Sequence, residues 1–148
     1  MLKFPKFKPE QPKFESIYTS NLCSFYQVDG QLYSIGDKQS GQLGFSKLDR
    51  MMTRPIPIQI PINRAQIVQV SCSDIHVLAL EANGAVFSWG RNANCVLGVK
   101  GNKGRIGEKV LEPEPVAVLK QAKVVYVSAC NSASFALNFR GRAFVWGK

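Results

Sequence analysis

The sequence predicts an all-β protein, a partial β-propeller of about two and a half repeat units whose ring is not closed. Three observations lead to this prediction. One glycine- and aromatic-rich phrase occurs three times, each copy alternates short apolar runs with glycine turns, and no stretch of about ten or more residues shows helical periodicity. All-β repeats of fifty-odd residues are in the size range of propeller blades.

The repeated phrase reads GQLYSIGDKQSGQLG at residues 30–44, GAVFSWGRNANCVLG at residues 84–98 and GRAFVWGK at residues 141–148. A single hairpin is marginally stable in water and must bury its aromatic face against a neighbour, which gives a physical reason for repetition. We expect the signature positions of the three copies to be structural. They are Gly30, Tyr33, Gly36, Gly41, Gly44, His76, Gly84, Phe87, Trp89, Gly90, Gly98, Gly141, Phe144, Trp146 and Gly147.

Each copy begins at a turn between two predicted strands. In the second copy, an apolar run at residues 77–80 and a return strand at residues 86–89 flank Asn83-Gly84. Both residues of this pair tolerate a positive φ, which predicts a two-residue hairpin turn. Asp29-Gly30 predicts the same turn in the first copy, and Arg140-Gly141 is a less suitable pair in the third.

Proline pairs mark the remaining segment of each unit. Pro55 and Pro57 in one unit correspond to Pro113 and Pro115 in the next. Proline cannot donate to a strand ladder, so these segments are expected to be extended edges or loops and not central strands. Upstream of each hairpin, runs such as residues 67–72 alternate apolar and polar residues, which predicts a half-buried strand.

Length and composition indicate one folded domain preceded by a leader. The chain has 148 residues, of which 45% are hydrophobic, enough for a buried core. We expect residues 1–16, basic and rich in Pro and Phe, to be a disordered leader, and residues 17–148 to form the incomplete propeller domain. The formal charge of +9 lies mostly in the last third of the chain, which suits either a solvated surface or contact with acidic partners.

The chemistry-bearing residues are few. The four cysteines form no CxxC pair and the chain has one histidine, so we expect no metal and no cofactor. The cysteines are interpreted as small buried residues of a reducing compartment. No signal peptide or membrane span is evident, so we expect an intracellular protein of the cytoplasm or nucleus, without membrane contact.

At these motifs the chain resembles the regulator of chromosome condensation repeat family. The stretch VSCSDIHVLALEANGAVFSWGRNANCVLG, residues 70–98, and the full Gly-Gln-Leu-Gly at residues 41–44 carry the resemblance, which covers about residues 17–148. It implies a seven-bladed β-propeller with a partner-binding role. Members act as guanine nucleotide exchange factors for small GTPases, as chromatin binders, and as interaction modules beside kinase or ubiquitin-ligase domains.

The copies depart from the family pattern at defined positions. The family histidine is present once, as His76, and the alignment puts Leu22 and Ala133 in its place in the other copies. Cys95 replaces a turn glycine, which predicts a changed turn there. Seven blades need well over twice this length, so we expect either a piece of a larger protein or assembly with other copies.

Two places in the sequence carry residues that could take part in chemistry. His76 is expected to be a structural residue bonding a backbone turn, with Asp74 as a nearby group that could pair with it. The glycine-rich loop at residues 98–109 carries Lys100, Lys103, Arg105 and Lys109. It is interpreted as a solvated loop, or alternatively as an anion or partner contact.

The predicted function is a protein-interaction module and not an enzyme, because no acid–base or nucleophile grouping stands out. Its partner would be a protein, with a small GTPase as one option, and no small-molecule substrate is expected. Two alternatives stay open: guanine nucleotide exchange on a small GTPase, and association with chromatin or DNA through basic loops.

Overall fold

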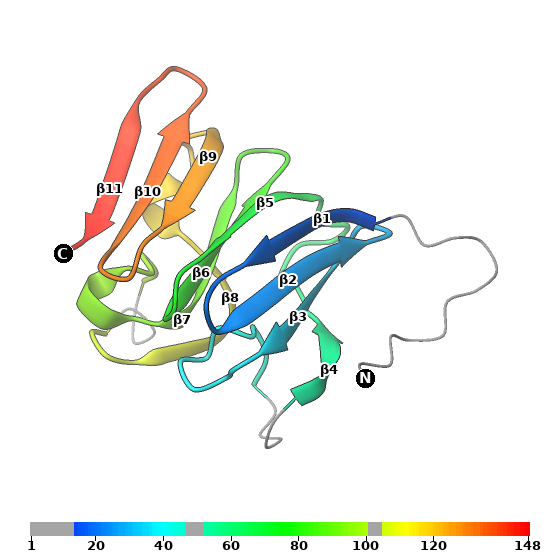
Figure 1. The fold of residues 1–148 in the computed structure, drawn as a ribbon. Helices are drawn as coiled ribbons and strands as arrows, with labels where there is room; N and C mark the ends of the chain where they lie inside the picture. Colours follow the sequence, from blue (N-terminus) through cyan, green and yellow to red (C-terminus); the bar gives the residue numbers. More distant parts are fainter. Residues whose placement is uncertain (1–13, 47–51, 101–104) are drawn as a thin grey trace.

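The computed structural model describes residues 14–46, 52–100 and 105–148. These residues form three antiparallel sheets placed side by side, with the second between the other two (Figure 1). Among the described residues the first and third sheets have no neighbour on their outer sides, so the ring is not closed and the predicted fold class is confirmed. Each sheet is one propeller blade, and we call them the first, second and third blades.

The strands follow one another in the order of the chain. The first blade consists of β1 (Phe14–Thr19), β2 (Cys23–Val28), β3 (Gln31–Gly36) and β4 (Met52–Pro57). The second consists of β5 (Ile67–Cys72), β6 (His76–Glu81), β7 (Val86–Arg91) and β8 (Lys109–Pro115). The third consists of β9 (Val124–Ala129), β10 (Ala133–Asn138) and β11 (Ala143–Gly147).

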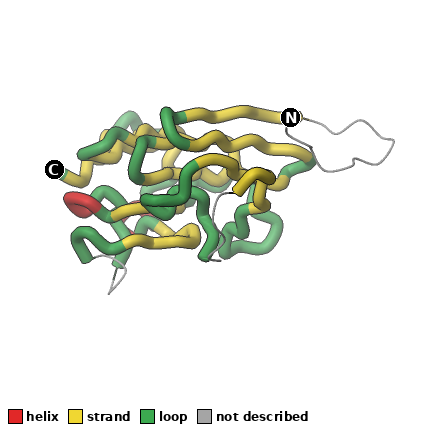
Figure 2. Tube along the Cα trace, turned by 60° about the horizontal axis from the view of Figure 1, so that its bottom comes forward, coloured by secondary structure: helices red, strands yellow, loops and turns green. Residues whose placement is uncertain are grey.

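Two short helical turns complete the described elements. The first, η1 (Ala93–Cys95), contacts β11, and Figure 2 draws a helical turn in red near the C-terminal end of the chain. The second, η3 (Ala117–Leu119), lies between the second and third blades in the sequence. Residues 1–13 of the expected leader lie outside the described residues, and β1 already begins at Phe14, inside the leader's expected span of 1–16.

The proline-containing segments are edge strands, as the sequence predicts. β4 and β8 are the last strands of their four-stranded sheets and pair on one side only, with β3 and β7. An edge strand leaves one row of backbone groups outside the ladder, where the missing N–H of proline costs no hydrogen bond.

The hairpin turns differ in length. Asp29 and Gly30 both have positive φ, 48° and 75°, and Val28 pairs directly with Gln31, so the predicted two-residue turn is confirmed. In the second blade only Gly84 has a positive φ, and the N–H of Glu81 donates to the carbonyl of Ala85. That turn therefore has three residues, and the prediction of a two-residue turn at Asn83-Gly84 is wrong.

The second blade is buried on both faces. β6 has every residue buried, with alternate side chains facing opposite neighbours. Val77 and Ala79 belong to the core shared with the first blade, and Leu78 and Leu80 to the core shared with the third. Trp89 is fully buried in the first of these cores, in an edge-to-face contact with Phe25 at 6.2 Å. The cores therefore lie between blades, and each blade depends on its neighbour to cover its apolar face.

Candidate functional site

The tryptophans of the second and third copies each join two blades. The indole nitrogen of Trp89 donates to the carbonyl of Gln42 in the preceding blade at 2.7 Å, and that of Trp146 donates to the carbonyl of Val96 at 2.7 Å. Gly44 and Gly98 lie against these rings: a Cβ added to them would be 3.0 Å from Trp89 Nε1 and 2.9 Å from Trp146 Nε1. The glycines thus leave room for the next blade's indole.

His76 is part of the same kind of joint. It is fully buried, with Nδ1 3.0 Å from the Ser73 hydroxyl of its own blade and Nε2 2.7 Å from the Ser134 hydroxyl of the third blade. Burial lowers the pKa of His76 to about 4, so the ring is neutral at neutral pH. With both nitrogens engaged and no exposed edge, the ring holds blades together and is not placed to exchange protons with a substrate.

Asp74 does not pair with His76. Its carboxylate accepts from the side-chain amide of Asn131 at 3.2 Å, while its own N–H donates to Asn131 Oδ1 at 3.0 Å. Gln69 makes a second such joint, donating to the carbonyl of Val127 at 2.9 Å and accepting from the N–H of Val127 at 3.0 Å. Both pairs connect the second blade to the third. The polar groups of Asp74 and Gln69 are therefore bonded within the protein and are not directed at a substrate.

The alignment of Leu22 with His76 is wrong. In the structure Cys23 pairs with Gly36 as His76 pairs with Gly90, while Leu22 is 43% exposed. The two-residue turn makes the first hairpin one residue shorter, which shifts the register upstream of it.

Cys23 and Cys72 share a hydrogen bond across the first two blades, which lowers the pKa of the Cys23 thiol and raises that of Cys72.

The turn that contains Cys95 differs from that of the first copy, as the sequence predicts, but the change lies at the preceding residue. Cys95 keeps the left-handed conformation of the glycine that it replaces, with φ of 61° against 77° at Gly41, and Asn94 is also left-handed at 56°. The expectation that the cysteines are buried needs correction. Cys95 and Cys130 are exposed free thiols and not small buried residues.

The residues of the predicted basic loop do not form one site. Lys100 borders a hollow of about 430 Å³ together with Glu114 and Lys120, whereas Lys109 borders a separate hollow of about 350 Å³ beside Leu43. Arg105 is exposed, and its carbonyl accepts from the Asn92 side chain at 3.1 Å. Lys103 lies outside the described residues.

A basic cluster that sequence reasoning missed lies at the β10–β11 turn. Phe139 is 58% exposed, with Arg140 Cζ at 5.2 Å and Lys123 Nζ at 6.0 Å from its ring centroid. Arg142 lies over the neighbouring Phe144 ring at 5.2 Å. We call Lys123, Phe139, Arg140 and Arg142 the basic tip. One signal could have found it: no acidic residue follows Glu114 in the chain.

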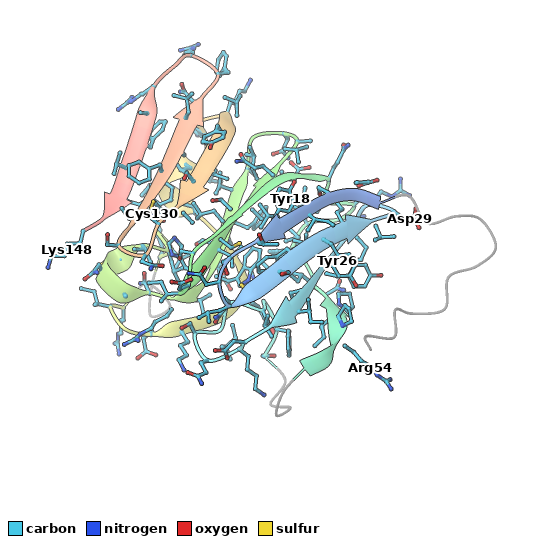
Figure 3. All side chains as sticks on the ribbon, in the orientation of Figure 1. Tyr18, Tyr26, Asp29, Arg54, Cys130 and Lys148 are labelled. Carbon is cyan, nitrogen blue, oxygen red and sulfur yellow. The ribbon has the colours of Figure 1, made fainter. Side chains whose placement is uncertain are left out.

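The third blade leaves one apolar face open. Phe135, Leu137 and Val145 are 39%, 37% and 63% exposed. Their pairing partners place them at the positions that Leu78, Leu80 and Ser88 occupy in the second blade, where all three are buried. In Figure 3 the side chains of β10 and β11 project on both sides of the third blade, with Cys130 and Lys148 at the end opposite the basic tip.

Two negative findings apply to the described residues. They contain no group of three or more His, Cys, Asp or Glu side chains that could hold a metal ion. None of their helical segments combines the length and the apolar character that crossing a membrane requires.

Comparison with protein families decides what these blades are. The model of the Regulator of chromosome condensation (RCC1) repeat matches residues 29–80 and 83–137, and a second model of this repeat matches residues 67–94. The chain belongs to the RCC1 repeat family. Each matched repeat begins near the hairpin turn of one blade and ends in the second strand of the following blade, β6 or β10, so the RCC1 repeat and the blade are out of phase.

Several curated proteins that are much longer than this RCC1-repeat chain are similar to it in sequence. It is 34% identical over 118 residues to the human "Probable E3 ubiquitin-protein ligase HERC6", covering 80% of this chain and 11% of the relative. It is 33% identical over 120 residues to the Xenopus laevis "Regulator of chromosome condensation", covering 81% and 26%. The chain thus spans between about a tenth and a quarter of the length of these relatives.

The fold is shared with a solved RCC1-type propeller. The structure of Prp20p from Saccharomyces cerevisiae, described with its binding properties to Gsp1p and histones, superposes with a TM-score of 0.77 at 24% identity. The match covers 90% of this chain and 33% of Prp20p. The described RCC1 repeats are therefore a section of a propeller fold.

Proposed function

We propose that this chain acts as a protein-interaction module within an RCC1-type propeller and does not itself catalyse a reaction. The observation that carries this proposal is the use of its buried polar side chains. His76, Gln69 and Trp89 each donate or accept across a blade boundary. A catalytic site needs polar groups that converge on an open cavity, and these groups converge on neighbouring blades instead.

The open face of the third blade supports a place in a larger propeller. Phe135, Leu137 and Val145 repeat the positions by which the second blade binds the third. We infer that a further blade of the same kind covers them, since an exposed apolar face of this type is an interaction surface or an aggregation liability.

The partners of the solved relative suggest the first binding experiment. Prp20p is described as binding Gsp1p and histones, so purified Gsp1p and histones are the probes, immobilised in turn for biolayer interferometry. Saturable binding to one of them supports the interaction module. Absence of binding to both, by a folded sample, would count against these two partners.

Nucleotide exchange is the second candidate, favoured by the likeness to Prp20p and by the family. Release of a labelled GDP from Gsp1p separates it from simple binding. We expect the rate of release to stay at its spontaneous value when this chain is added, because a three-blade section presents only part of a propeller's loops. Acceleration of release that scales with chain concentration would contradict the proposal of a non-catalytic module.

Association with chromatin is the third candidate, and DNA would be its contact. Residues 115–148 contain five cations and no carboxylate side chains, which disfavours basic histones and favours a polyanion.

The exposed free thiols of Cys95 and Cys130 fit a reducing compartment, so we propose that the protein is intracellular, in the cytoplasm or the nucleus.

A further inference from the structure

The three hairpin tips of this chain differ in chemistry, and the second and third share a three-residue turn. They read Asp29-Gly30, Ala82-Asn83-Gly84 and Phe139-Arg140-Gly141. Asp, Asn and Gly are the residues that such turns favour, and Phe and Arg are not. The third tip therefore carries residues that the turn itself does not favour. The fold gives no reason for the exposed ring of Phe139 or for the neighbouring cations Arg140 and Arg142 at this site.

The basic tip is held in a defined geometry. The side-chain oxygen of Asn138 accepts from the N–H of Arg140 at 3.1 Å and of Arg142 at 2.9 Å, which fixes the turn that carries both arginines. The N–H of Phe139 donates to the carbonyl of Lys123 at 3.2 Å, which ties the ring to the third cation. A fixed surface loses little conformational entropy when a partner binds, and this raises its affinity.

The aromatic rings of the basic tip favour an acidic peptide over single-stranded nucleic acid. Arg140 and Lys123 lie over the ring of Phe139, and Arg142 lies over that of Phe144. Faces covered by cations are not free platforms for stacked bases, as single-stranded nucleic acid requires. A guanidinium laid on a ring keeps its N–H edge available for a bidentate bond to a carboxylate.

We propose that the basic tip, formed by Lys123, Phe139, Arg140 and Arg142, binds an acidic segment of a partner protein, whose carboxylates pair with the cations held on the two aromatic rings. This inference rests on the proposed function, because an acidic peptide segment belongs to a protein partner. Glu114, the nearest preceding carboxylate in the sequence, lies with Lys100 and Lys120 in the hollow beside η3 and is not part of the tip.

The test is fluorescence anisotropy with a labelled peptide of eight glutamates, its glutamine counterpart as the uncharged control, and single-stranded and duplex DNA as competing polyanions. At low salt we expect the glutamate peptide to bind, the glutamine peptide not to bind, and neither DNA to bind more tightly than the glutamate peptide. The double variant Arg140→Gln/Arg142→Gln should weaken binding by about tenfold or more, because it removes two charge-assisted contacts. Phe139→Ala keeps the charge but removes the ring that holds Arg140, and it should weaken binding severalfold.

A matched control separates the tip from general positive charge. Arg54→Gln/Arg91→Gln removes the same charge from exposed positions on β4 and β7, outside the tip, and should change the affinity less than about twofold. Equal loss in both double variants, or an unchanged affinity for Phe139→Ala, would overturn the proposal. Tighter binding of either DNA, lost in the same tip variants, would reassign the tip to nucleic acid.

The outcome is separable from the wider function. If Gsp1p or histones bind while the glutamate peptide does not, the interaction module stands and only the assignment of the basic tip falls. Circular dichroism of each variant checks that a lost affinity does not come from unfolding.

Discussion

At the scale of single residues, buried polar groups hold neighbouring blades together. Ser134 shows how closely they are linked: its hydroxyl lies 2.7 Å from His76 Nε2 and donates to the carbonyl of Val96 at 2.7 Å, the same carbonyl that Trp146 contacts. Such a network is favourable only while each member keeps its partners, since an unpaired buried polar group is costly. Changes of charge or hydrogen bonding here should act on stability and not on a reaction.

The first residue-scale prediction concerns pH. The pKa of His76 is about 4 in the folded chain against 6.5 ordinarily, so the unfolded chain binds a proton that the folded chain excludes. The stabilising effect is complete above pH 6.5 and is lost as the pH falls from 6.5 towards 4, at up to about 1.4 kcal/mol per pH unit. Urea unfolding across this window measures it.

His76→Gln is the matched variant for this effect. The chain has one histidine, so the variant should lose the part of the pH dependence that lies between pH 6.5 and 4. A slope that survives unchanged in His76→Gln would assign the proton uptake to carboxylates instead.

The second residue-scale prediction ranks the two tryptophan joints. Trp89 is fully buried, and Trp89→Phe should lower the free energy of unfolding by about 2–3 kcal/mol through the lost bond to Gln42 and the space left behind. Trp146→Phe should cost about 1 kcal/mol, since Trp146 is half-buried and Val96 also accepts from Ser134. Urea unfolding followed by circular dichroism gives both values, and the reverse order would be evidence against the joint.

At the scale of elements, glycines that are alike as members of the repeat signature have different structural roles. Gly90 has φ of 112°, and an added Cβ would run into the carbonyl of Ile75 and reach 2.7 Å from the Cα of His76. Gly30 has φ of 75° but open space around it. The first glycine therefore permits the close approach of two chain segments, and the second permits only a turn.

This contrast gives a prediction with a built-in control. Gly30→Ala should cost about 1 kcal/mol, the strain of a left-handed residue. Gly90→Ala should cost about 3 kcal/mol or more, because backbone must also move. Chemical denaturation of the two variants tests the difference, and similar losses would show that the close approach to Ile75 relaxes cheaply.

The element scale also shows where sequence reasoning succeeds and where it stops. The proline pairs and the two-residue turn at Asp29-Gly30 follow from local chemistry, and the structure agrees with both. Asn83-Gly84 carries an equally good local signal but forms a longer turn, since β6 is buried on both sides and its register is fixed by two cores. The same one-residue difference moved Cys23 into the position that alignment had given to Leu22.

At the scale of the whole molecule, contacts between blades follow the repeat length. The side-chain bonds that residues 69–76 of the second blade make to the third join residues 57 or 58 positions apart, as for Asp74 with Asn131 and His76 with Ser134. A repeat spacing therefore indicates which positions meet across blades. It does not show which loops share a surface, and so the sequence predicts neither that Lys100 and Lys109 border separate hollows nor that Lys123 lies beside Phe139.

The open face of the third blade leads to the last prediction. A copy of this chain has exposed apolar side chains at each end of its row of blades: Phe135 and Val145 on the third, and Ile17, which is 69% exposed and pairs with Tyr26, on the first. Two ends of different shape favour head-to-tail contacts, which do not close by symmetry. We expect reversible self-association whose weight-average sedimentation coefficient rises with concentration.

Substitutions can show whether the face or the strand edge is responsible. Phe135→Lys/Val145→Lys places charges on the open face and should weaken association by about tenfold or more, because a charge there would be buried without a partner. Ile106→Lys, at a residue that is 71% exposed on a loop of the second blade, should leave it unchanged. β11 also has an unpaired edge within the described residues, and such an edge can template pairing with another chain. Association that persists in the double variant would place the contact at that edge, and a sedimentation coefficient independent of concentration would mean that neither end binds a second copy.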